Sequence, residues 1–160
     1  MFLHRIQEDG TALRKVVPDP VNFLYDVSPD GKWLAVWMSV SGDVALYPVE
    51  GGSPVTICSG CGTAGGEQRG VTPPLVTWAP DQRVVYLHGA RGQQTYAVPL
   101  RPGEILPPLP ESGLASAADF AGLPGARLLP EPRAFAGPDP SLYAFPRIAA
   151  QRNIYRISVP

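Results

Sequence analysis

Short hydrophobic runs separated by turn residues fill most of the chain, and this pattern predicts many short β-strands. In the clearest stretch the expected strands are 23–27, 32–38, 43–49 and 54–58. Between the first two, Pro29, Asp30 and Gly31 predict a hairpin turn, because proline presets φ, aspartate bonds nearby amides and glycine accepts a positive φ. The second strand is hydrophobic on both faces, with Trp33, Ala35 and Trp37 on one and Leu34, Val36 and Met38 on the other. A small sheet of this kind needs a neighbouring sheet on each side.

The same pattern recurs along the chain, which indicates a structural repeat. SPDGKWLAVWM at 28–38 matches APDQRVVYLHG at 79–89 with an offset of 51 residues. GPDPSLYAF repeats the turn once more, NIYRISVP at 153–160 corresponds to the third strand, and FLHRIQEDGT near the start matches VALYPVEGG. The recurring turn residues are Pro29, Asp30, Gly31, Pro80, Asp81, Pro138 and Asp139. Because Pro48 and Pro99 fall at the same place inside the third strand, we expect a shared bulge or a position without a ladder hydrogen bond there.

Composition agrees with a protein made of short strands. Of the 160 residues, 20 are proline and 17 are glycine, while 44% are hydrophobic. These values argue against collagen and disorder, and frequent proline argues against an all-helical protein. Four-stranded sheets arranged radially would cover one another's hydrophobic faces. The sequence therefore predicts an all-β fold, a partial β-propeller of about three and a half four-stranded antiparallel blades that is not closed.

We expect one partial propeller over residues 1–160. Its expected parts are a half blade at 1–18, blades at 22–58 and 74–106, a proline-rich inter-blade excursion at 107–131 and an incomplete blade at 132–160. Within the excursion, residues 107–110 are rich enough in proline for a polyproline segment, whereas 111–123 predicts a short helix. Closed propellers have four to eight blades. The count therefore predicts either a fragment of a longer propeller or self-association through open sheet edges.

SPDGKWLAVW followed by DVALYPVEGGSPVTIC resembles the TolB-type, WD-like propeller repeat of bacteria, in which a Ser-Pro-Asp-Gly turn precedes an apolar strand and a strand that ends in Gly-Gly. The later copies depart from this pattern at Ala79, Gln82, Gly137 and Pro140. The resemblance covers most of the chain outside 101–131. It implies a propeller of the kind found in periplasmic TolB-like proteins, on serine peptidases, or as the carboxy-terminal sensor region of bacterial serine/threonine kinases.

Charge and hydropathy bear on the partners. Thirteen basic and fourteen acidic residues give a net charge of −1, so neither nucleic acid nor an anionic membrane surface is an expected partner. No stretch approaches 18 consecutive apolar residues, and we expect no signal peptide or transmembrane helix in this chain. The compartment is not predicted.

Cys58 and Cys61 form a Cys-Ser-Gly-Cys motif, for which we expect either a local disulfide or two unpaired thiols. Haem attachment would need histidine where the chain has Gly62. A structural zinc site would need two more ligands, but His4 and His88 fall in separate expected strands. We therefore expect no metal and no cofactor.

Neither the G-x-S-x-G nor the G-x-x-x-x-G-K motif occurs, and we expect no catalytic residue. Propeller topology brings the blade-to-blade loop 59–73 and the loops between second and third strands to one face. There Glu67, Arg69 and Arg91 are candidate rim-binding residues. The sequence thus predicts a non-enzymatic propeller module for a protein or small ligand, belonging to a larger bacterial protein. The alternative is an accessory or sensor propeller of a serine/threonine kinase or serine peptidase whose catalytic domain lies outside this chain.

Overall fold

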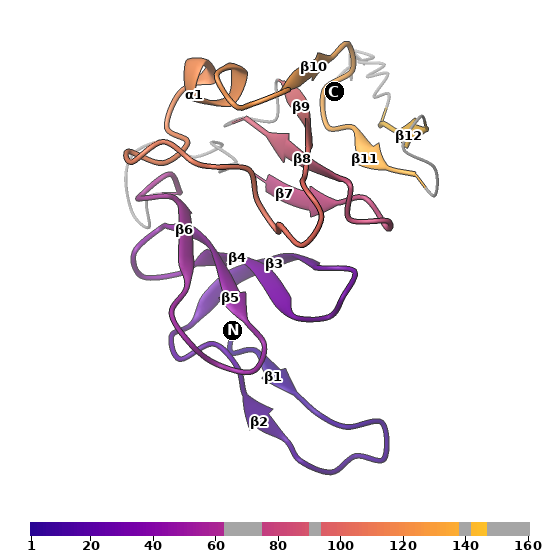
Figure 1. Cartoon of the computed structure of the whole chain (residues 1–160). Helices are drawn as coiled ribbons and strands as arrows, with labels where there is room; N and C mark the ends of the chain where they lie inside the picture. Colours follow the sequence, from indigo (N-terminus) through magenta and orange to yellow (C-terminus); the bar gives the residue numbers. More distant parts are fainter. Residues whose placement is uncertain (63–74, 90–93, 138–141, 147–160) are drawn as a thin grey trace, which may run out of the picture.

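The computed structural model describes residues 1–62, 75–89, 94–137 and 142–146. Within these residues the fold is all-β, with four antiparallel sheets of two to four strands and one short helix (Figure 1). None of these sheets closes into a barrel. The predicted class, a partial and unclosed propeller-like array, is confirmed.

The first four-stranded sheet follows the clearest repeat. Its strands pair in chain order: β3 (Val21–Val27), β4 (Trp33–Met38), β5 (Val44–Pro48) and β6 (Val55–Cys58). In the β3–β4 turn, the Asp30 carboxylate accepts hydrogen bonds from the Ser28 hydroxyl at 2.6 Å and the Lys32 amide at 3.1 Å. Gly31 has a φ of +72°, the left-handed conformation that glycine adopts at no steric cost. Asp30 thus supplies the hydrogen bonds of this turn, and Gly31 supplies its left-handed backbone.

The second four-stranded sheet departs from the expected boundaries. Its strands are β7 (Leu75–Trp78), β8 (Val84–His88), β9 (Thr95–Pro99) and β10 (Arg127–Leu129). The described residues within 74–106 form three strands of this sheet, and the fourth follows a long connection. The segment 107–131, expected between blades, therefore lies mostly within this one. We call residues 101–126 the strap; it contains helix α1 (Ala117–Ala121), inside the predicted helical stretch. β10 escaped prediction because three residues are too few to show a period of two.

The β-hairpin turn recurs at equivalent places in three sheets. At each place, the amide of one residue donates a hydrogen bond to the carbonyl of the residue five positions later. These pairs are Ser28 to Trp33 (2.9 Å), Ala79 to Val84 (2.9 Å) and Gly137 to Leu142 (3.0 Å). In the second turn the Asp81 carboxylate accepts the Arg83 amide at 3.0 Å, as Asp30 accepts that of Lys32. Pro138 and Asp139 lie outside the described residues.

A two-stranded sheet flanks each end of this pair. One consists of β1 (His4–Arg5) and β2 (Arg14–Lys15), and the other of β11 (Phe135–Ala136) and β12 (Tyr143–Ala144). Figure 1 shows β1–β2 beyond the first sheet and β11–β12 beyond the second. The strand 153–160, predicted next to β12, lies outside the described residues.

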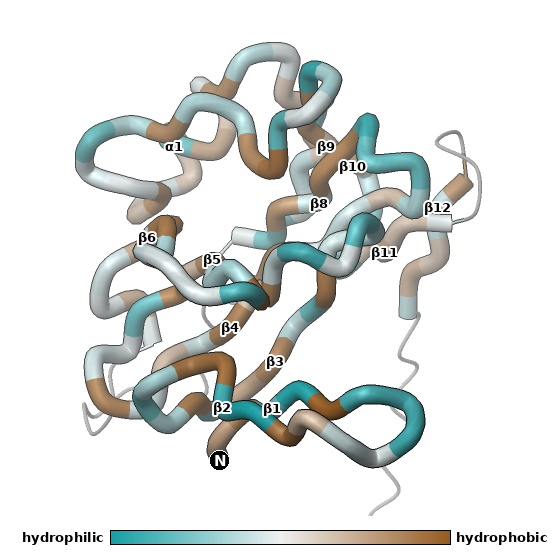
Figure 2. The backbone as a smooth tube through the Cα atoms, turned by 60° about the horizontal axis from the view of Figure 1, so that its bottom comes forward, coloured by the Kyte–Doolittle hydropathy of each residue, from teal (hydrophilic) through white to brown (hydrophobic). Residues whose placement is uncertain are grey.

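Three hydrophobic layers alternate with the four sheets. The first, between β1–β2 and the first sheet, contains Val17, Val21, Leu34, Val36 and Met38. The second, between the two larger sheets, includes Ala35, Leu46, Val76, Trp78, Leu87 and Val98, and the strap adds Leu114, Phe120 and Leu123. The third contains Ala79, Tyr86, Ala97, Leu129 and Ala134. Successive β4 residues enter opposite layers, and Figure 2 shows brown, hydrophobic stretches along β3 and β4. This is the two-faced burial that the sequence predicts.

Pro48 and Pro99 end their strands at equivalent positions, opposite Trp33 and Val84. The register of both strand pairs is continuous up to the proline, so neither position is a bulge. The next amide, that of Val49, bonds the Lys32 carbonyl at 2.8 Å, so the alternating ladder turns the Pro48 nitrogen away from β4. Of the two expectations, the position without a ladder hydrogen bond is the one observed.

Candidate functional site

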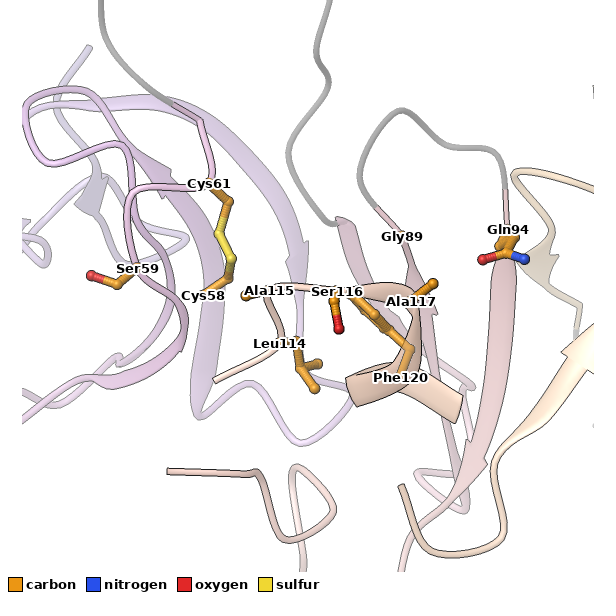
Figure 3. A pocket seen from close by; sticks show the side chains of 10 residues that line it. All are labelled: Cys58, Ser59, Cys61, Gly89, Gln94, Leu114, Ala115, Ser116, Ala117 and Phe120. Atoms are coloured by element: carbon orange, nitrogen blue, oxygen red, sulfur yellow. A yellow bond between two sulfur atoms is a disulfide. The ribbon is translucent and has the colours of Figure 1, made fainter. Parts of the chain in front are cut away.

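A pocket of about 270 Å³ lies where the two larger sheets meet the strap (Figure 3). Its lining consists of Cys58 at the end of β6 with Ser59 and Cys61 after it, Gly89 and Gln94 between β8 and β9, and Leu114 to Ala117 with Phe120 from the strap. Leu114 and Phe120 are buried and form an apolar side, whereas Ser116 and Gln94 carry polar groups. All of these residues are uncharged. Such a pocket suits a neutral group that is partly apolar.

A disulfide joins Cys58 and Cys61, whose Cα atoms lie 5.9 Å apart, and it forms one wall of the pocket. The loop between them is bonded to the preceding hairpin. The Asp43 carboxylate accepts the Gly60 amide at 2.7 Å and the Ser59 hydroxyl at 3.2 Å. Burial alone would raise the pKa of Asp43, but the hydrogen bonds, first that from the Gly60 amide, lower it overall. The wall is therefore held by backbone and side-chain bonds as well as the disulfide.

The opposite wall is the strap, which bonds directly to the edge of the first sheet. The Leu114 amide donates to the Ile57 carbonyl of β6 at 2.8 Å. A Cβ on Gly113, which has a φ of +71°, would lie 2.7 Å from the same carbonyl oxygen. Glycine is therefore required here both for its conformation and for this close approach. The strap thus covers part of the β6 edge and fills the space between the outer ends of the two sheets.

Helix α1 is fixed at its start by one carboxylate. Asp119 accepts hydrogen bonds from the amides of Ala115 and Ser116 at 3.0 and 2.7 Å and from the Ser116 hydroxyl at 2.9 Å. These bonds, with those from Ser116 the strongest, lower the pKa of Asp119. The ring of Phe120 stacks on Tyr96 of β9 with centroids 5.7 Å apart. The pocket wall is therefore tied both to its own helix and to the second sheet.

His88 lies at the other face of the second sheet and is 2% exposed. The Ala134 amide donates to the Thr95 hydroxyl oxygen at 3.1 Å, and the same hydroxyl shares a hydrogen bond with His88 Nδ1 at 3.2 Å. The other ring nitrogen, Nε2, has no hydrogen-bond partner among the described residues. Burial, and then the charge of Arg133, lower the pKa of His88 to about 4. His88 is a buried structural group that links β8 to the segment before β11.

The predicted rim residues Glu67, Arg69 and Arg91 lie outside the described residues. The described ends of the two loops that carry them do come together, because Cys61 and Gly89 line the same pocket. Sequence reasoning missed the contribution of the strap, which supplies five lining residues. The long spacing between Pro99 and the outer strand, Arg127–Leu129, contrasts with the short turn between β5 and β6, and it is the signal that would have indicated an insertion before the outer strand.

Two kinds of feature are absent from the described part of the chain. It contains no group of three or more His, Cys, Asp or Glu side chains placed to hold a metal ion. It also contains no helix with the length and hydrophobicity that crossing a membrane requires. No family model, curated protein or solved structure matches the chain. The resemblance to TolB-type repeats therefore stays a prediction from the sequence motifs.

Proposed function

We propose that this chain is a non-catalytic, propeller-type binding module that holds a neutral protein segment or small molecule in the pocket between its two larger sheets. The observation that carries the proposal is the convergence of three separate segments on one pocket whose described lining residues are all uncharged. The apolar side formed by Leu114 and Phe120 would bury a hydrophobic group, and the polar groups of Ser116 and Gln94 would orient it. Loops carried by a rigid sheet are common locations for binding residues.

Fragment binding followed by NMR tests this proposal directly. The probes are benzyl alcohol, isobutanol and N-acetyl-leucine amide, which are neutral and small enough for a pocket of about 270 Å³. We expect chemical-shift changes at Gln94, Ser116 and the residues around them. Replacing Ala117 with Trp places an indole at the pocket lining and should abolish these changes.

Ala118→Trp is the matched control, because Ala118 is also exposed on α1 but does not line the pocket. It should leave fragment binding unchanged. Shift changes that map elsewhere, or that persist equally in both variants, would contradict the proposed site. Charged analogues such as acetate and ethylamine should bind more weakly than the neutral probes, since the described lining residues offer no ionic partner.

A further inference from the structure

Each two-stranded sheet reproduces one half of the four-stranded template. In β1–β2 the partners are His4 with Lys15 and Arg5 with Arg14. In β5–β6 they are Ala45 with Thr56 and Leu46 with Val55, at the same sequence separations. The first two-stranded sheet therefore has the register of the third and fourth strands of a blade, and the positions of the first and second strands beside it are empty among the described residues.

The other two-stranded sheet has the complementary register. In β11–β12 the partners are Phe135 with Ala144 and Ala136 with Tyr143. The first two strands of the larger sheets pair with the same separations: Asp26 with Ala35, Val27 with Leu34, Thr77 with Tyr86 and Trp78 with Val85. β11–β12 therefore corresponds to strands one and two of a blade, which are the two that β1–β2 lacks.

The free edges of the two halves also match in hydrogen bonding. The Gly137 amide bonds the Leu142 carbonyl, so by alternation the amide and carbonyl of Tyr143 point away from β11. The Val16 amide bonds the Leu3 carbonyl, so those of His4 and Ile6 point away from β2. Among the described residues, both edges consequently present backbone groups without a partner, at the intervals that an antiparallel ladder requires.

Exposed hydrophobic side chains gather on the same two sheets. In the part of the chain that the structure describes, twelve large hydrophobic residues are exposed, and seven of them lie in or beside the half sheets: Met1, Phe2, Ile6, Leu13, Phe135, Leu142 and Phe145. Their exposed fractions run from 41% to 67%. Exposed hydrophobic residues concentrated in this way mark a surface that another element covers.

We propose that two copies of this chain associate reciprocally, with β12 of each copy pairing antiparallel to β1 of the other to complete two shared blades. The register follows from the β4–β5 pairs of the first sheet, Leu34 with Tyr47 and Ala35 with Leu46. It places Tyr143 opposite Ile6 and Ala144 opposite Arg5 of the second copy. One chain holds two blades and two complementary halves, so two chains complete six blades, within the range of closed propellers.

Cross-linking tests this register. One population carries Arg5→Cys and another Ala144→Cys; they are mixed, equilibrated and oxidised mildly. The native cysteines are already joined to each other. We expect a covalent dimer in the mixture and none in either population alone, because each new cysteine faces an unchanged residue in its own dimer. Arg5→Cys mixed with Tyr143→Cys is the out-of-register control and should not cross-link, since neighbouring strand residues point to opposite faces.

Light scattering tests the number of copies. We expect a particle of twice the 17.1 kDa chain mass. Ile6→Pro removes an amide from the free edge of β1 and should raise the dimer dissociation constant about tenfold or more. Lys15→Pro is the matched control: Lys15 pairs with His4, has its amide on the far edge of β2 and is not among the exposed hydrophobic residues, so the substitution should leave dimerisation unchanged.

Three results would overturn the proposal: a monomer at all concentrations, an open polymer, or equal cross-linking in and out of register. Residues 153–160, predicted as a third strand, would compete for the same edge of β12. If they occupy it within one chain, the in-register mixture yields no covalent dimer, which also overturns the proposal. Failure here leaves the pocket untouched, because none of its lining residues belongs to either half sheet.

Discussion

The two larger sheets share one template but secure their outer ends differently. In the first sheet a short turn leads directly from β5 to β6, and a disulfide and the Asp43 bonds hold the residues that follow. In the second, the strap separates β9 from β10 and packs its own hydrophobic residues into the layer between the sheets. Interactions between residues close in the sequence thus hold the outer strand β6, whereas β10 depends on contacts between residues that are far apart in the sequence.

The interiors of the two sheets show a second difference. Ala35 lies opposite Leu46 in the first sheet, and the equivalent pair in the second is Tyr86 opposite Ala97. Each pair faces the following sheet and combines one large with one small side chain, but the order is reversed. The repeat therefore preserves which face is buried and the presence of one bulky group, not the residue at each position.

The strap gives the strongest test of this comparison. Phe120 is 2% exposed and stacks on Tyr96, so Phe120→Ala should lower the free energy of unfolding by about 3–5 kcal/mol, through lost burial and a residual cavity. Leu128→Ala on β10 removes a side chain that is 51% exposed and should cost less than about 1 kcal/mol. Urea unfolding at pH 7 measures both. Equal losses would mean that the strap is not part of the core.

The second test uses the position at which the sheets differ in chemistry. His88 and Thr95 stand where the first sheet has Trp37 and Val44. The pKa of His88 is lowered to about 4 in the folded protein, against about 6.5 when unfolded. Between these values the unfolded chain binds a proton that the folded chain does not. The free energy of unfolding should therefore fall by up to about 3 kcal/mol as pH drops from 6.5 to 4. Below pH 4 the contribution of His88 should no longer change.

His88→Gln isolates this effect, because glutamine has no proton to gain in that window. The difference in unfolding free energy between pH 6.5 and pH 4.5, measured in urea, should shrink in the variant. Carboxylates with lowered pKa values, such as Asp43 and Asp119, lose their contribution at lower pH and should be unaffected. An unchanged pH dependence would show that His88 titrates normally in the fold.

Sequence reasoning succeeded where the structure is determined locally. Gly31 and its neighbours define the first turn, and alternation along β4 predicts which residues enter each layer. It failed at β10, because three residues are too few to show an alternating pattern and the strap separates them from β9 in the sequence. The pocket could not be predicted from the sequence either, because it depends on the position of the strap. Leu114 and Phe120 join it through tertiary contacts with Ile57 and Tyr96, which no short-range pattern reports.

The disulfide provides the third test, of the first sheet's outer end. The double substitution Cys58→Ser and Cys61→Ser should lower the free energy of unfolding by about 2 kcal/mol, because a closed loop this short removes little entropy from the unfolded chain. The same double variant should leave the strap packed, so Phe120→Ala should remain equally costly in that background. Thermal unfolding measures both. A much larger loss would mean that the disulfide organises the whole junction.

The smallest effect concerns the two Pro-Asp turns, and a reciprocal swap tests their equivalence. Gln82 has a φ of +56° at the position where the first turn has Gly31 with a φ of +72°. A side chain at a left-handed position costs about 1 kcal/mol relative to glycine. Gln82→Gly should therefore stabilise the protein by about that amount, and Gly31→Gln should destabilise it similarly, since a Cβ there meets no atom within 4 Å and only the backbone cost remains. Denaturation midpoints that move in opposite directions would support one shared turn geometry. A swap in which both variants lose stability would mean that the glutamine side chain, not the backbone, determines the second turn.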